Sequence, residues 1–141
     1  MRRIRSTDTK PELVVRRLLY SMGYRYHLHA RELPGRPDIV FRHRRAAIFI
    51  HGCFWHLHRA CRDGTFPKTR MNYWSAKLRS NTMRDRRHLG ELRRLGWRVL
   101  RVWECDIEKR YITLPARLES FLRDPGSIGK TKRIQSKPKS L

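Results

Sequence analysis

The sequence predicts one α/β domain followed by a basic tail. At 141 residues the chain is long enough for a single buried core. Apolar residues at helical spacing alternate with short apolar runs, in the order helix, three strands, helix, strand, helix. Residues 1–123 carry this pattern. Residues 124–141 are rich in Gly, Ser, Lys and Pro, so we expect this tail to be disordered and to lie near phosphates.

The first helix is predicted to begin at Thr9. Thr9 is a good N-cap residue, Pro11 is tolerated in a first turn, and Glu12 completes the pattern of a capping box. The apolar residues from Val14 to Met22 recur at helical spacing until Gly23 ends the helix. Capping alone would explain Glu12.

Three strands are predicted next. Alternation over residues 24–28 indicates the first, and the Pro- and Gly-containing segment 33–37 indicates a turn. The apolar runs 38–41 and 46–50 are separated by the polar segment 42–45, so the pair predicts a hairpin.

A long helix, a strand and a final helix complete the prediction. Residues 71–95 carry a helical pattern that Gly96 ends. The run Trp97–Trp103 is typical of a strand, and residues 115–122 predict the last helix.

The charge of the chain favours a polyanionic partner. Lys and Arg total 34 against 12 acids, which gives a formal net charge of +22. Many of these residues are Arg interleaved with aromatics, a composition that favours nucleic acid over a membrane surface. A ribosomal-type protein would share this charge but would not need the cluster of His and Cys described next.

No apolar run approaches a membrane span, and the first residues lack the apolar stretch of a signal peptide. We therefore expect an intracellular, cytoplasmic protein without membrane association. Three cysteines cannot all pair within one chain, and in a reducing compartment metal binding explains them better than disulfides.

The segment from His51 to Cys61 has the most unusual composition of the chain. Its imidazoles and thiols surround two adjacent aromatic residues, an arrangement that neither a core strand nor an ordinary helix requires. Such residues hold metals or transfer protons. The chemically relevant members of the segment are His51, Cys53, Phe54, Trp55, His56, His58 and Cys61.

Asp38 and the hairpin together predict a Mg²⁺ site. Taken alone, an aspartate directly after a proline, as at Asp38, is typical of a turn. The hairpin, however, would bring Asp38 to the junction of Ile50 and His51, where the Ile50 carbonyl is a second oxygen ligand. His51 could then take a proton from the attacking water, and His56 could donate one to the phosphate or to the leaving oxygen.

The thiols predict a separate structural zinc site. Cys53, His58 and Cys61 lie in one polar loop, and Cys105 follows the last strand. Three cysteines and one histidine form a closed tetrahedral set for Zn²⁺. The alternative is three buried apolar thiols. Zinc is favoured because so polar a loop needs a metal to fold.

The aromatic pair Phe54 and Trp55 would be held rigidly between these ligands. Large side chains at the edge of a DNA-binding loop can wedge between base pairs. For Tyr73 we expect core packing instead, and for Trp74 the spacing leaves both readings open.

Four segments resemble the very-short-patch-repair (Vsr) DNA mismatch endonucleases. They run over residues 33–38, 48–56, 84–87 and 95–105, and the resemblance spans about residues 1–110 in order. The string from His51 to His56 is its most specific part.

The resemblance implies a PD-(D/E)xK restriction-endonuclease-like core, with a mixed central sheet flanked by helices and a structural zinc site. It also implies Mg²⁺-dependent nicking of duplex DNA on the 5′ side of the thymine in a T·G mismatch, which arises by deamination of 5-methylcytosine. We expect a monomer in a bacterial, nucleoid-associated setting, with other mismatch-repair proteins as further candidate partners.

The resemblance also implies roles for individual residues. Asp38 matches the metal-ligating carboxylate, His51 and His56 match the catalytic histidines, and Glu12 and Asp85 match supporting acids. The zinc ligands are matched by Cys53, His58, Cys61 and Cys105. The aromatics that enter the DNA are matched by Phe54, Trp55 and Trp74, and Met1 matches a methionine that approaches from the minor groove.

Three departures from the family pattern affect these expectations. Ile50 stands where the family often has Thr, which leaves a carbonyl ligand intact. The segment from His58 to Cys61 is one residue longer, and the family's N-terminal arm ahead of Met1 has no counterpart. Asp85 could also be explained as an ion-pair partner on a helix rich in arginine. The competing functions are a DNA-cleaving relative without T·G specificity and a zinc-stapled DNA-binding module without activity.

Overall fold

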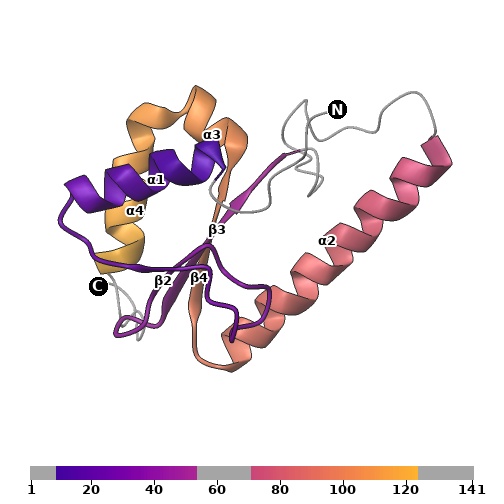
Figure 1. Ribbon diagram of the computed structural model, residues 1–141, viewed down its shortest axis with the longest axis horizontal. Helices are drawn as coiled ribbons and strands as arrows, with labels where there is room; N and C mark the ends of the chain where they lie inside the picture. The colour runs from indigo at the N-terminus through magenta and orange to yellow at the C-terminus, as the bar shows by residue number, and fades with distance from the viewer. Residues whose placement is uncertain (1–8, 54–70, 124–141) are drawn as a thin grey trace, which may run out of the picture.

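The computed structural model describes residues 9–53 and 71–123. Within them a four-stranded sheet lies between two helical layers. Helices α1, α3 and α4 cover one face, and the long helix α2 covers the other (Figure 1). None of the helices in these ranges is long and apolar enough to cross a membrane. The expected basic tail, residues 124–141, lies outside the described ranges.

Helix α1 (Lys10–Ser21) begins where the sequence predicts. The Thr9 hydroxyl accepts a hydrogen bond from the Glu12 backbone N–H at 3.4 Å. Val15 and Leu19 on the inner face are fully buried. Gly23 follows the helix with φ +95°, a left-handed conformation that suits glycine. Capping, amphipathic spacing and glycine termination together explain the position of α1.

The sheet has the order β1-β2-β3-β4. Strands β1 (His27–Leu28), β2 (Ile39–Phe41) and β3 (Ala46–His51) are antiparallel neighbours, and β4 (Arg98–Trp103) is parallel to β3. Ile39 pairs with Ile48, so the predicted hairpin is confirmed. The parallel pair β3–β4 requires a crossover, which α2 supplies.

The first strand is shorter than predicted. Tyr24 and Tyr26 precede β1 and pack edge-on against Phe41, with ring centroids 6.0 and 6.3 Å away. Their alternation therefore reflects aromatic packing rather than strand pairing.

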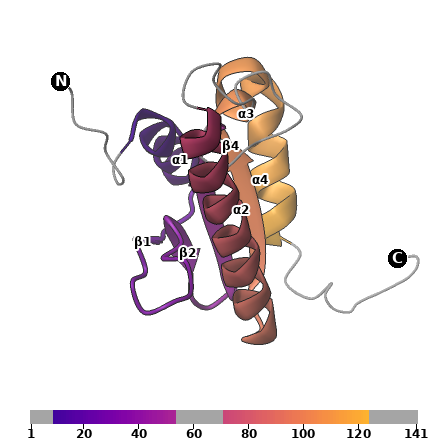
Figure 2. The ribbon, with the colours of Figure 1, turned by 90° about the vertical axis from the view of Figure 1, so that its right-hand side faces the viewer.

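Two hydrophobic cores lie on opposite faces of the sheet, each beneath one of the helical layers drawn in Figure 2. The larger joins β2 and β3 to α1 and to α4 (Leu114–Arg123), whose Leu118 and Leu122 are fully buried. The smaller joins the opposite face to α2 (Met71–Arg94), including Leu89 and Leu92. Strand β3 has five of its six residues buried because helices cover it on both sides.

Two short elements after β4 were not predicted: α3 (Glu104–Lys109) and the 3₁₀ turn η2 (Tyr111–Thr113). They are too short to show an apolar period. The buried carboxylate of Asp106 ties these elements to the end of β4 and to α4. It accepts from the Trp103 backbone N–H at 3.0 Å and pairs with Arg110 at 3.1 Å and Arg117 at 3.2 Å. Burial opposes ionisation of Asp106, but these hydrogen bonds and arginines outweigh burial and lower its pKa.

Gly35 lies where the loop before β2 passes beneath α2. Its φ is +77°, and an added Cβ would lie 2.9 Å from His88 Cβ and 3.1 Å from Phe49 Cζ. Gly35→Ala should therefore lower the free energy of unfolding, by backbone strain and by a clash worth about 1–3 kcal/mol. Urea denaturation measures this loss.

Gly23→Ala is the matched control. Gly23 has a similar left-handed φ of +95°, but nothing lies within 4 Å of its added Cβ. It should incur the backbone strain without the clash. Equal losses for the two variants would show that the close approach of Gly35 to α2 is unimportant.

Candidate active site

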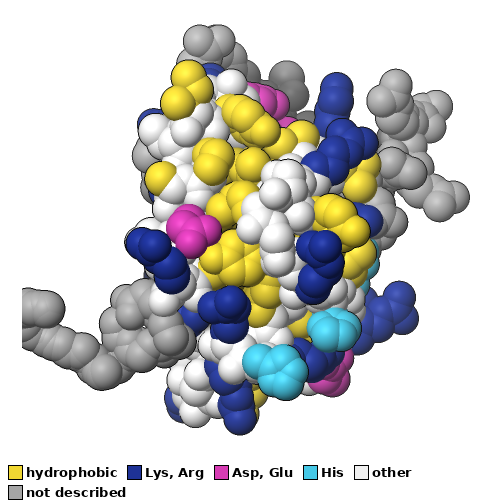
Figure 3. Space-filling model, turned by 90° about the vertical axis from the view of Figure 1, so that its left-hand side faces the viewer, with side chains coloured by type: hydrophobic (Ala, Val, Ile, Leu, Met, Phe, Trp, Pro, Cys, Tyr) yellow, Lys and Arg dark blue, Asp and Glu magenta, His cyan; other side chains and the backbone are white. Residues whose placement is uncertain are grey.

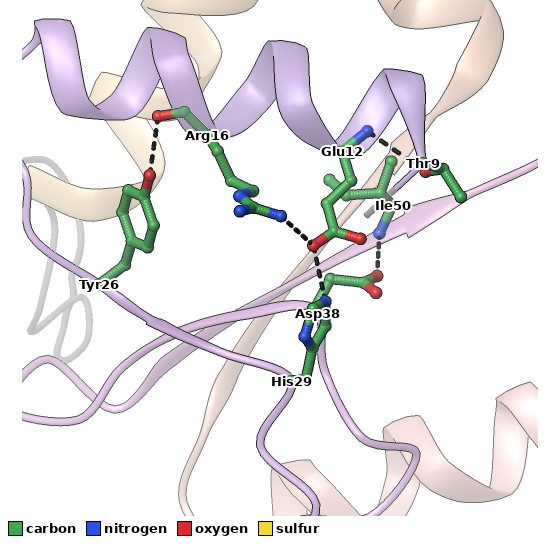
Figure 4. Close-up of polar contacts among 7 residues, drawn as sticks. All are labelled: Thr9, Glu12, Arg16, Tyr26, His29, Asp38 and Ile50. Carbon is green, nitrogen blue, oxygen red and sulfur yellow. Dashed lines mark hydrogen bonds and ion pairs between the residues drawn. The ribbon is translucent and has the colours of Figure 1, made fainter. Parts of the chain in front are cut away.

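Asp38 lies immediately before β2 and reaches across to β3. Its Oδ2 accepts a hydrogen bond from the Ile50 backbone N–H at 2.8 Å (Figure 4). The antiparallel register places the start of β2 beside the end of β3, so the contact follows from the hairpin. The structure thus brings together Asp38 and the Ile50–His51 junction.

Two further side chains converge on Asp38. Glu12, from the first turn of α1, is 1% exposed, and its Oε2 lies 2.7 Å from His29 Nε2 and 3.1 Å from Arg16 Nη1. Ligand atoms of Glu12, His29 and Asp38 all lie within 4.8 Å of one another. The sequence predicts a capping or a supporting role for Glu12, and no sequence pattern predicts a role for His29. Knowledge of the β1–β2 register would have placed His29 opposite Asp38.

His51 ends β3 in a buried position, 6% exposed. Its ring packs against Phe49 and Trp103, with centroids 5.4 and 5.3 Å away. Arg101 on β4 directs Nε and Nη2 toward His51 Nδ1, both at 3.3 Å. Arginine only donates hydrogen bonds, so Nδ1 accepts and a neutral His51 carries its proton on Nε2.

Asp85 on α2 approaches the same residues from the other side. Its Oδ2 lies 3.9 Å from Arg101 Nη2. Burial lowers the pKa of Arg101, as do Arg93 and Arg86, whereas the Asp85 charge raises it. Asp85 therefore pairs with an arginine of β4, a partner outside its own helix.

A cavity of about 560 Å³ connects these groups. Asp38, His51 and Asp85 line it together with His29. Its wall also carries the basic side chains of Arg31, Arg36, Arg84 and His88. This arrangement suits a phosphodiester. The arginines at the wall can bind the phosphate oxygens, and the carboxylates inside can bind a metal cation that also contacts the phosphate.

The surface charge extends beyond the cavity. On the side drawn in Figure 3, Lys and Arg side chains are spread around an apolar area and acidic side chains are sparse. This distribution agrees with the net charge of +22 and suits a polyanion larger than a single phosphate.

Cys53 and Cys105 form a small buried cluster with Trp103. Cys53 follows β3 and Cys105 is the second residue of α3, so the parallel pairing of β3 with β4 brings the two cysteines together. The other expected zinc ligands, His58 and Cys61, lie outside the described residues.

The expected DNA-contacting aromatics are only partly covered by the structure. Trp74 is half-buried in the first turns of α2, and its ring packs edge-on to Tyr73 with centroids 5.1 Å apart. Tyr73 is 49% exposed, so its predicted place in the core is wrong: α2 extends beyond the sheet at this end. Met1, Phe54, Trp55 and His56 lie outside the described ranges.

Comparison with known proteins identifies the family of this chain. Residues 1–62 match the family model of DNA mismatch endonuclease Vsr. The chain is 50% identical over 125 residues to the type II nicking enzyme V.XorIIP of Xanthomonas oryzae pv. oryzae, covering 89% of the chain and 90% of that protein. The chain belongs to the Vsr DNA mismatch endonuclease family.

Other relatives in the Vsr family support the same assignment. The chain is 41% identical over 131 residues to DNA mismatch endonuclease Vsr of Escherichia coli K12, covering 90% of the chain and 83% of that protein. It is 39% identical over 124 residues to the type II nicking enzyme V.NmeAIP of Neisseria meningitidis, covering 88% and 87%. The protein is thus a DNA endonuclease, and the family implies a restriction-endonuclease-like fold for its mixed sheet.

Proposed function

We propose that this protein is a Mg²⁺-dependent endonuclease that nicks duplex DNA on the 5′ side of the thymine in a T·G mismatch. The observation that carries the proposal is the Asp38 carboxylate held against Ile50, beside buried His51, in a cavity edged by arginines. Family membership supplies the reaction class, and the mismatch is the finer part of the proposal.

The groups at the end of β3 fit a hard cation. The Asp38 carboxylate and the Ile50 backbone carbonyl are oxygen ligands, which Mg²⁺ prefers. When bound there, Mg²⁺ would neutralise phosphate charge and increase the acidity of a coordinated water. Asp38 would hold the cation in a defined place, because its 2.8 Å hydrogen bond from Ile50 N–H orients the carboxylate.

We assign His51 the role of a hydrogen-bond donor rather than a proton acceptor. Its Nδ1 faces Arg101, so the Nε2–H of the neutral ring could donate a hydrogen bond to a phosphate oxygen and stabilise the negative charge there. Accepting a proton from water, as first expected, would require Arg101 to leave Nδ1. His56 is then the candidate for the group that gives a proton to the leaving oxygen. Glu12 and Asp85 act as supporting acids.

Arg101→Met should change the tautomer of His51. Removing the guanidinium frees Nδ1, so the Nε2–H form loses its enforced preference. Nitrogen-15 NMR of the imidazole should report Nε2–H in the parent protein and a mixture of both tautomers in Arg101→Met. A parent protein already in the Nδ1–H form would contradict the assigned donor role.

The remaining residues support binding. Cys53, Cys105, His58 and Cys61 are proposed to hold Zn²⁺, and the buried pair Cys53–Cys105 fits thiolate ligation. Zinc would supply a tetrahedral link between the loop after β3 and the start of α3. Phe54, Trp55 and Trp74 would wedge into the duplex, with Met1 in the minor groove.

The mismatch requirement is tested with two duplexes that differ in one base. A T·G duplex should be nicked about a hundredfold faster than its T·A counterpart, because a mismatch lowers the cost of unstacking by a few kcal/mol. The rates are measured under single turnover in Mg²⁺ across several flanking sequences. Equal rates on both duplexes would favour the second candidate, a nicking enzyme without T·G specificity. The relatives named type II nicking enzymes keep that candidate open.

A further inference from the structure

Glu12, His29 and Asp38 form a mixed oxygen and nitrogen cluster at one side of the cavity. Their ligand atoms lie within 4.8 Å of one another, and Figure 4 shows the three side chains pointing toward a common space. His29 was not anticipated from the sequence, and the roles proposed above do not use it.

The backbone holds the three residues in place. The His29 N–H donates to the Asp38 carbonyl at 3.0 Å, which continues the β1–β2 pairing by one residue and puts the two side chains opposite each other. His29 has φ +48°, a conformation that histidine adopts more readily than most residues. Glu12 reaches the same point from α1, where Arg16 binds its carboxylate.

The spacing suits a six-coordinate cation after small movements. Ligands at about 2.1 Å from a shared ion lie about 3.0 Å apart when adjacent and about 4.2 Å apart when opposite. The His29 Nε2 to Glu12 Oε2 distance is 2.7 Å, and the largest separation in the cluster is within 4.8 Å. His29 and Asp38 also line the cavity, which gives an ion a path from solvent.

We propose that His29 is a nitrogen ligand of a cation held by Glu12 and Asp38, and that this site therefore binds a first-row transition dication such as Mn²⁺ more tightly than Mg²⁺. The chemical reason is the imidazole. Mg²⁺ prefers an all-oxygen shell, whereas transition dications accept histidine nitrogen. The ion would replace the direct contact between His29 Nε2 and Glu12 Oε2, with the imidazole proton on Nδ1.

The competing explanation is structural. His29 could serve only to orient Glu12 through their hydrogen bond. His29→Gln separates the two explanations, because glutamine can still donate to Glu12 but offers no imidazole nitrogen to a metal. The inference rests on the proposed function only in that Asp38 is part of both sites.

The test is Mn²⁺ binding without DNA, followed by electron paramagnetic resonance. Mn²⁺ is a suitable probe because it is the weakest competitor among first-row dications for thiolate sites. The parent protein should bind Mn²⁺ with a nitrogen-14 coupling in pulsed spectra. His29→Gln should abolish the coupling and weaken Mn²⁺ binding about tenfold or more, while Mg²⁺ affinity, measured by competition, changes less than about threefold. His43→Gln, at an exposed residue of the β2–β3 turn, is the matched control and should behave as the parent.

Different results would overturn the His29 inference and the proposed nicking function. Bound Mn²⁺ without nitrogen coupling in the parent protein, or equal weakening of Mn²⁺ and Mg²⁺ by His29→Gln, would overturn the inference even if T·G duplexes are nicked. A nitrogen-coupled Mn²⁺ in a protein that nicks no duplex would instead overturn the proposed function. Should His29→Gln fold poorly, His29→Asn replaces it, since asparagine tolerates positive φ.

Discussion

Asp38→Asn is expected to abolish nicking while leaving duplex binding intact. Asparagine keeps an oxygen that can accept from Ile50 N–H, so the end of β2 should retain its geometry. It loses the charge that holds the cation, and the metal contributes several kcal/mol to transition-state stabilisation. We expect the single-turnover rate to fall at least about a thousandfold and the dissociation constant for duplex to change by less than about threefold.

The control for Asp38→Asn is Glu32→Gln. Glu32 forms an exposed ion pair with Arg42 at the surface, and its loss should leave nicking and stability almost unchanged. Residual nicking in Asp38→Asn at more than about a tenth of the parent rate would show that the carboxylate is not the main cation ligand.

Replacing the buried cysteines is expected to have the second largest effect. If Cys53 and Cys105 hold zinc, Cys53→Ser and Cys105→Ser should each release it and lower the free energy of unfolding by at least about 3 kcal/mol. The double variant should be hardly worse than either single one, because the first substitution already removes the metal. Metal analysis and urea denaturation, with and without chelator, measure these quantities.

The alternative of two apolar thiols gives a different pattern. Each serine would then leave a buried hydroxyl and cost a modest, separately additive amount, and chelator would not change the parent unfolding curve. A parent protein that contains no zinc, and whose unfolding curve is the same with and without chelator, would exclude the proposed structural zinc site.

The parts of the fold that could be predicted depend on local pattern. The hairpin follows from two apolar runs around the polar segment 42–45, and this alone brought Asp38 to Ile50. Helix α2 and strand β4 follow from a sustained apolar period and its end at Gly96. Capping chemistry located the start of α1.

The parts that could not be predicted depend on contacts between distant segments. Arg101 reaches His51 because β4 pairs with β3 in parallel, with Arg101 opposite Phe49 and Trp103 opposite His51. His29 meets Glu12 and Asp38 only when α1 and β1 are docked on β2. Neither contact leaves a periodic signal in the sequence, and α3 depends on Asp106 rather than on an apolar stripe.

In the proposed reaction, a divalent cation at Asp38 directs a single-strand cut next to a mismatched thymine. The most direct measurement maps the products of a T·G duplex labelled on either strand, in Mg²⁺ and in EDTA. We expect one cut, in the thymine strand immediately 5′ of the mismatched base, and none in EDTA. Cutting of both strands, cutting at a position independent of the mismatch, or cutting that persists in EDTA would contradict the account.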